Sequence, residues 1–176
     1  ELLIVGLAPG AHGANRTGRP FTGDAAGEVL YGALYEYGFC NMPTVLDRKD
    51  GLKLKNAYIT NAVKCVPPGN RPTGPEKQAC LDWFRAEVLR LKQVRLFLTL
   101  GKDAFEACLR LQREMGGVNR LKDYRFAHGG VFRFKEDSRI LLSSYHFSRY
   151  NMNTGVLTLE MVDSIFSKVK TLLSER

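Results

Sequence analysis

Four short runs of the chain are continuously apolar instead of alternating between apolar and polar residues. The runs are Leu2–Ala8, Ala57–Val63, Val94–Leu100 and Ile140–Ser144. Continuous runs of this length are typical of strands buried on both faces of a parallel sheet. Elsewhere apolar residues recur every three or four positions, the period of a helix with one buried face. This pattern predicts helices over 26–37, 80–91, 103–115 and 159–173.

Strands that alternate with helices indicate β-α-β units, which place helices on both faces of a parallel sheet. We therefore expect an α/β fold with three layers (α/β/α) and a central four-stranded parallel sheet. The 176 residues are 44% hydrophobic, which is enough for one core. With no internal repeat or linker, residues 1–176 are expected to form a single domain.

Three loops rich in glycine, proline and polar residues each come directly after a predicted strand. They cover residues 9–24, 66–75 and 145–155. Ligands of open α/β sheets bind at the carboxyl ends of the strands. The three loops are therefore expected to meet at one cleft.

The 9–24 loop is rich in glycine, but its spacing matches neither GxxxxGK[ST] nor GxGxxG, which argues against a nucleotide-phosphate loop. It surrounds Phe21 with basic and amide side chains, an arrangement suited to stacking on a base while its backbone is held. Two simpler interpretations stay open. Phe21 can be a core residue, and Asp24 can cap the helix that starts after it, which is the role that spacing alone favours.

The other two loops also carry candidate ligand-binding side chains. Four prolines stiffen the 66–75 region, where Asn70 and Arg71 lie close to Asn61. An asparagine amide has a donor and an acceptor, so it can distinguish the edge of a pyrimidine. His146 can stabilise an anionic leaving group or serve a structural role. His128 lacks such neighbours, and we expect it to be structural.

The charge and the cysteines narrow the class of protein. The net charge of +8 and the pI of about 9.5 favour nucleic acid as a partner, or else a basic enzyme of a small anionic substrate. The first apolar run is far shorter than the ~20 residues that span a bilayer, and it lacks the basic start of a signal peptide. The four cysteines form no CxxC pair, as expected of a cytoplasmic protein without membrane partners. Because the chain begins without Met in a strand, we expect further residues upstream.

At this point the motifs are similar to those of a known family. GLAPGAHGANRTGRPFTGD, KCVPPGNRPT with Glu76 and Cys80, and SYHFSRYN with its HxSxxN pattern stand in the same order. They resemble the uracil-DNA glycosylase superfamily, most closely the B-type, or family 5, iron–sulfur thermostable enzymes, over essentially the whole chain. The resemblance implies a uracil-DNA glycosylase-like fold. It also implies a monofunctional DNA-repair hydrolase, without lyase activity, that removes uracil and other deaminated bases such as hypoxanthine and leaves an abasic site.

The resemblance also implies roles for individual residues. Other glycosylase families have a carboxylate or amide after the first glycine, where this chain has Leu7 and Ala8. Asp24 is similar to the catalytic aspartate of the B-type enzymes, and Asn70 and His146 match residues implicated in catalysis. The residues expected to bind the flipped base are Gly10, His12, Phe21 and Asn61. Those expected to hold DNA phosphates are Arg16, Arg19, Lys64, Arg71 and Arg149.

The cysteines acquire a second interpretation from the resemblance. Two thiols alone make only half of a metal or cluster site, which favours unligated cysteines. The relatives imply a [4Fe–4S] cluster held by Cys65, Cys80 and two cysteines upstream of residue 1, in a monomeric protein. The alternative is a lineage without the cluster. Two other functions stay open: a non-catalytic DNA-damage-binding relative, suggested by Leu7 and Ala8, and an enzyme of small nucleotides.

Overall fold

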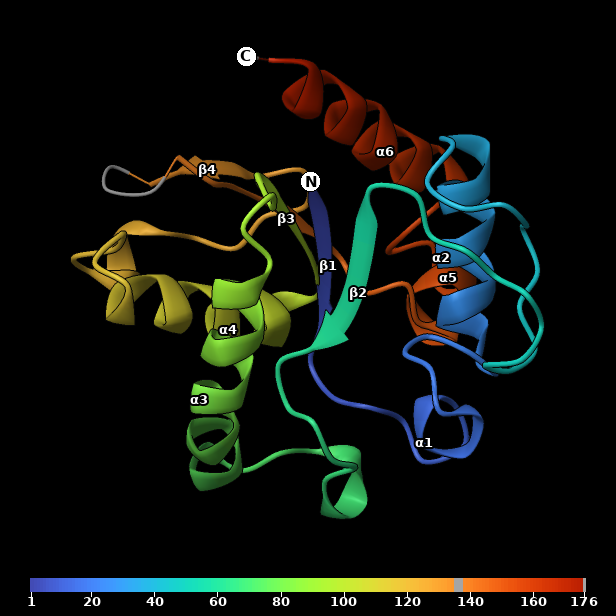
Figure 1. Cartoon of the computed structure of the whole chain (residues 1–176), viewed down its shortest axis with the longest axis horizontal. Coiled ribbons are helices and arrows are strands. Elements are labelled where there is room, and N and C mark those ends of the chain that lie inside the picture. Colours follow the sequence, from blue (N-terminus) through green and yellow to red (C-terminus); the bar gives the residue numbers. More distant parts are fainter. Residues whose placement is uncertain (135–137, 176) are drawn as a thin grey trace.

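The computed structural model describes residues 1–134 and 138–175, and its centre is a five-stranded sheet (Figure 1). The strand order is β2-β1-β3-β5-β4. The strands are β1 (Leu2–Gly6), β2 (Ala57–Asn61), β3 (Leu96–Leu100), β4 (Val131–Arg133) and β5 (Ile140–Ser144). The four parallel strands expected from the sequence are confirmed. The structure adds β4, a short antiparallel strand at the edge beside β5, whose three half-buried or exposed residues carry no apolar run.

Helices cover both faces of the sheet, which confirms the three layers. Leu2 and Ile4 of β1 pack with α2 (Ala25–Glu36) and α6 (Leu159–Ser174). The side chains of Leu3 and Val5 point the other way, because successive residues of a strand alternate between faces, and they pack with α3 and α4. Helix α3 spans Gly74–Arg90 and α4 spans Lys102–Glu114. Figure 1 shows these two pairs of helices on opposite sides of the sheet.

The main helices begin at residues whose side chains cap them. Thr73 accepts a hydrogen bond from the backbone of Glu76, whose carboxylate in turn accepts one from the backbone of Thr73. Thr158 caps α6 and Asp24 caps α2 by accepting one hydrogen bond each, from the backbone N–H groups of Met161 and Gly27. Such caps satisfy backbone N–H groups that have no partner inside the helix, at about 1 kcal/mol each. The remaining short elements are α1 (Ala14–Thr17), η1 (Pro68–Asn70), η2 (Leu121–Asp123) and α5 (Arg149–Asn153).

The carboxyl ends of the strands meet at one edge of the sheet. Gly6 at the end of β1 pairs with Asn61 at the end of β2, and Leu100 pairs with Ser144. The first strands end two residues earlier than expected, although their hydrogen bonding continues: the Val63 N–H donates to the carbonyl of Leu7. The period of apolar residues predicted Trp83 on the buried face of α3, which is wrong because its side chain is 71% exposed. Within the described part of the chain, no helix is long and apolar enough to cross a membrane.

Candidate active site

A cavity of about 390 Å³ opens at the carboxyl edge of the sheet. Its wall contains residues from all three loops that the sequence singled out. The predicted site residues that line it are Gly10, Phe21, Asp24, Asn61, Asn70 and His146. The expectation that these loops meet at one cleft is therefore confirmed. Leu7 and Ala8 also line the cavity and offer it no acidic or basic side chain.

Phe21 lies on the cavity wall in an unusual backbone conformation. Its φ is +52°, a left-handed conformation that costs a residue with a side chain on the order of 1–3 kcal/mol. The ring is 7% exposed, so Phe21 is a core residue that also faces the cavity. A Cβ built on Gly6 would lie 2.7 Å from Phe21 Cζ and 2.4 Å from Asn61 Oδ1. Gly6 therefore lets the ring and the amide approach each other.

Asn61 presents a free amide to the cavity. The residue is 8% exposed, and its side chain has no hydrogen-bond partner among residues 1–134 and 138–175. Its backbone carbonyl is occupied, because Lys64 Nζ donates to it at 2.7 Å. A buried amide without partners costs free energy unless a ligand or water completes its hydrogen bonds. The donor and the acceptor of Asn61 are therefore available to a base.

Asp24 combines the two roles that the sequence left open. Its Oδ1 accepts a hydrogen bond from the Gly27 N–H at 2.8 Å, so it caps α2 as the spacing favoured. The same carboxylate lines the cavity. A Cβ on Gly13 would lie only 2.4 Å from Asp24 Oδ2, so a glycine is needed there. The cap holds one oxygen and leaves the other without a hydrogen bond from the described residues.

His146 stands opposite Phe21 in the cavity. The two ring centroids are 6.3 Å apart and inclined at 35°. Burial lowers the pKa of His146 below 6.5, and the nearby negative charge of Asp24 opposes this shift only in part. The imidazole is therefore neutral at pH 7. Asn151 Nδ2 donates to the backbone carbonyl of His146 at 2.8 Å and fixes the loop that carries it.

His128 contacts Tyr145, the residue before His146, in the structural role expected of it. Its Nδ1 accepts a hydrogen bond from the backbone N–H of Tyr145 at 3.2 Å. Its ring also lies 5.0 Å from the ring of Tyr145. Burial lowers the pKa of His128 as well, which keeps Nδ1 free to accept. The residue before His146 is thereby held in place.

The lowered pKa of His146 makes stability depend on pH. Between its folded pKa and the unfolded value near 6.5, the unfolded chain binds more protons, so the free energy of unfolding falls as the pH drops below about 6.5. The His146→Gln variant should lose this contribution, at most about 1.4 kcal/mol per pH unit. Urea unfolding between pH 7.5 and 5 measures it. The exposed His12, changed to Gln, is the control, and equal pH profiles for parent and His146→Gln would contradict a neutral buried imidazole.

Three of the predicted ligand-binding residues, His12, Arg19 and Lys64, do not line the cavity. Arg19 forms an ion pair with Asp50, with Arg19 Nη2 2.5 Å from Asp50 Oδ2, and it also donates to Thr22. Lys64 Nζ lies 2.6 Å from Glu87 Oε2. Both cations are paired with carboxylates of the protein itself, which within the described part of the chain distinguishes them from the other basic side chains expected to hold phosphates. His12 is exposed and is not part of the cavity wall.

The remaining predicted phosphate-binding residues are exposed. Arg16 Nε donates to the backbone carbonyl of His12, next to the cavity loop. Arg71 ends the η1 turn that carries Asn70, and Arg149 begins α5 after the His146 loop. All three side chains lie on loops that line the cavity or beside such loops. Asn70 itself has a φ of +58° and is exposed at the cavity.

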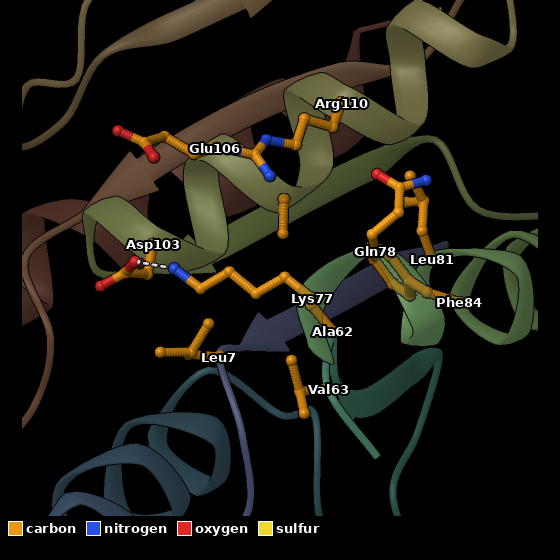
Figure 2. A pocket seen from close by; sticks show the side chains of 11 residues that line it. Leu7, Ala62, Val63, Lys77, Gln78, Leu81, Phe84, Asp103, Glu106 and Arg110 are labelled. Carbon is orange, nitrogen blue, oxygen red and sulfur yellow. Dashed lines mark hydrogen bonds and ion pairs between the residues drawn. The ribbon is translucent and has the colours of Figure 1, made fainter. Parts of the chain in front are cut away.

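Sequence reasoning missed the junction of β3 and α4, where Gly101 and the first two residues of α4, Lys102 and Asp103, line the cavity. The rule about strand ends applies to this junction too, but its connection is the single residue Gly101, which does not stand out in composition. Asp103 Oδ1 lies 2.6 Å from Lys77 Nζ, and Figure 2 shows this pair joining the starts of α4 and α3. The crevice drawn there holds about 20 Å³, room for a single water. A base therefore needs the larger cavity beside it.

The cysteines fall into two kinds. Cys40 and Cys108 are buried in the core, and burial raises the pKa of both thiols. Cys65 is exposed after β2, and Cys80 is half-buried on α3. Within the described residues, no group of three or more histidine, cysteine or acidic side chains gathers at a metal site. Cys65 and Cys80 are accessible thiols and supply half of the donors that a four-cysteine cluster needs.

Comparison with known proteins places the chain in a family. The family model described as the uracil DNA glycosylase superfamily matches residues 1–170. A type-5 uracil-DNA glycosylase of Mycobacterium leprae is 47% identical over 173 residues, which make up 98% of this chain and 73% of the relative. Those of Mycobacterium bovis and Thermus thermophilus are 46% and 45% identical, over 98% of this chain and 63% and 75% of their own lengths. The chain therefore belongs to the uracil DNA glycosylase superfamily, and within it to the type-5 uracil-DNA glycosylases.

Proposed function

We propose that this chain removes uracil from DNA by hydrolysing the N-glycosidic bond and leaves an abasic site. One observation carries the proposal: an aromatic ring, an unpartnered amide and a carboxylate line the same cavity at the carboxyl edge of the sheet. Phe21 and Asn61 suit the recognition of a base, and Asp24 suits the chemistry at the sugar. The relatives are named uracil-DNA glycosylases, which supports the same activity.

The base must leave the DNA stack to reach this cavity. Its face then lies against Phe21, and its hydrogen-bonding edge meets Asn61, whose amide offers a donor and an acceptor. Basic side chains at the rim hold the phosphates without reading sequence, a role that fits Arg16, Arg71 and Arg149. Other deaminated bases such as hypoxanthine offer similar edges, and we include them among the candidate substrates.

The reaction breaks the bond between the base nitrogen and C1′ of the sugar. The bonding electron pair leaves with the base, and positive charge develops on the sugar. The carboxylate of Asp24 stabilises this charge and accepts the proton of the water that attacks C1′. The neutral imidazole of His146 donates a hydrogen bond to the departing uracil anion, and Asn70 at the cavity mouth helps to position the reacting groups.

The proposed enzyme is monofunctional. A lyase forms a Schiff base between a lysine amine and the sugar. Lys102 is the one lysine on the cavity wall within the described residues. Its Nζ lies 3.9 Å from Glu106 Oε1, and its side chain is 70% exposed, so it lies at the rim and not in a desolvated position that would activate an amine. We therefore expect an intact strand after base removal.

The proposed cofactor is a [4Fe–4S] cluster with a structural role. Cys65 and Cys80 would supply two of its four ligands, and two further cysteines would have to come from outside this sequence. Cys80 lies on α3, and Cys65 belongs to the segment between β2 and η1, so a cluster there would tie the Asn70 loop to α3. We further propose that the protein acts as a monomer in the cytoplasm.

The role of Asn61 provides the test of base recognition. Asn61→Ala removes two hydrogen bonds to the base edge, and kcat/KM for a uracil-containing oligonucleotide should fall about 10- to 100-fold. Asn119→Ala, a change of an exposed asparagine away from the cavity, is the matched control and should behave like the parent. A full rate for Asn61→Ala would remove the amide from the proposed mechanism.

A second candidate function rests on Leu7 and Ala8, which place no acid or base at the start of the cavity wall. It is a relative that captures a damaged base or abasic site without turnover. Such a protein would bind the uracil oligonucleotide and release no uracil. The presence of Asp24 on the same cavity wall favours an enzyme over a protein that only captures the base.

A further inference from the structure

A second, larger cavity lies beside the candidate active site. It holds about 570 Å³ between α4 and residues 121–126, and we call it the α4 groove. Lys102 lines both cavities, so the groove continues from the rim of the active site.

Five of the side chains that line the α4 groove are charged. Four are basic, and one, Glu106, is acidic. Of the basic ones, the exposed Arg110, Lys122 and Arg125 have no ion-pair or hydrogen-bond partner in residues 1–134 and 138–175. Three unpaired cations around one hollow attract an anionic partner.

The wall of the α4 groove also contains three aromatic rings, those of Phe105, Tyr124 and Phe126. Phe126 lies edge-on to Phe105 at a centroid distance of 5.6 Å, and Tyr124 lies 5.8 Å from Phe132. These contacts hold the half-buried Tyr124 and Phe126 rigidly at the groove. Fixed rings beside free cations are the arrangement that binds single-stranded nucleic acid, with bases on the rings and phosphates on the cations.

We propose that the α4 groove binds a single-stranded segment of the DNA that flanks the base being excised. The charge and the rings select a nucleic acid, and the continuity through Lys102 connects it with the strand in the active site. The rings favour a single strand, because only unpaired bases expose the faces that stack on aromatic side chains. This proposal rests on the proposed function for the identity of the strand.

The test uses binding of a uracil-free 30-nucleotide single strand, measured by fluorescence anisotropy at several salt concentrations. The double variant Lys122→Glu/Arg125→Glu should weaken binding at least tenfold. The negative slope of log K against log[salt] should become less steep by about 1.4, the value for two phosphate contacts on a single strand. The control is Lys53→Glu/Lys55→Glu, two exposed lysines before β2 with the same change of net charge.

A short substrate separates the groove from the active site. Excision from a five-nucleotide strand with a central uracil should differ less between parent and double variant than excision from a 30-nucleotide strand, since the short strand has only two nucleotides on either side of the base. Equal weakening by the double variant and by the control overturns the proposal, and so does a loss that affects duplex DNA or an acidic peptide but not the single strand. If the parent protein binds the 30-mer through this groove but excises no uracil, the proposed function is refuted, while single-strand binding by the α4 groove is still supported.

Discussion

Replacing Asp24 with Asn is expected to lower the single-turnover rate of uracil excision about a thousandfold while DNA affinity and folding stay near those of the parent. The amide has no negative charge to stabilise the developing cation and cannot accept the proton of the attacking water, effects worth about 10²- to 10⁴-fold. Asn caps a helix about as well as Asp. The free energy of unfolding should therefore fall by no more than about 1 kcal/mol, the value of a charge at the start of a helix.

The control for this change is Asp82→Asn, on the outer side of α3, where the side chain is 81% exposed. Rates are measured with enzyme in excess over a uracil-containing oligonucleotide, so that product release does not limit them. A fully active Asp24→Asn variant would mean that Asp24 is only the cap of α2. A rate loss accompanied by an equal loss of stability would point to the same conclusion.

Replacing Gly27 with Ala is the second change with a large expected effect, although Gly27 has no chemical role. The residue lies in the first turn of α2, and a Cβ there would lie 1.8 Å from the backbone carbonyl oxygen of Phe21. The Phe21 segment must therefore move. Overpacking of this kind costs about 1–3 kcal/mol. We expect that loss in unfolding free energy and a fall in excision of at least tenfold, because the ring that stacks on the base is displaced.

Gly32 in the same helix is the matched control. A Cβ on Gly32 meets nothing within 4 Å. Ala is more favourable than Gly within a helix by about 0.5–1 kcal/mol, so Gly32→Ala should stabilise the protein and leave excision unchanged. The two alanine variants are expected to shift the urea midpoint in opposite directions. Stabilisation by both would show that Phe21 and α2 are not packed as described.

Much of the fold could be predicted because burial on both faces leaves a clear pattern. Leu2–Gly6 and Ile140–Ser144 are apolar or small at every position, which predicted that both strands lie inside a parallel sheet. Strand β4 could not be predicted in this way, since it lies at an exposed edge and pairs with one neighbour only. Trp83 follows the helical period of α3, yet it points to solvent because position alone does not fix a helix's buried face.

The site was predictable to the level of its loops and less so to the level of its side chains. Strand order brought Asn61 and His146 to one edge. The ion pair between Arg19 and Asp50 could not be predicted, because the two residues lie 31 positions apart in the sequence. The left-handed backbone of Phe21 depends on close packing against Gly27. Lys102 was missed because it begins α4 only two residues after β3 ends, with no loop of unusual composition to mark it.

The most direct test of the central claim is to quantify free uracil after a single turnover with excess parent protein. The substrate is an oligonucleotide with one uracil, and mass spectrometry follows both the free base and the strand. The account predicts one uracil released per strand and an intact strand with one abasic site. An oligonucleotide that stays tightly bound and still carries its uracil would contradict it.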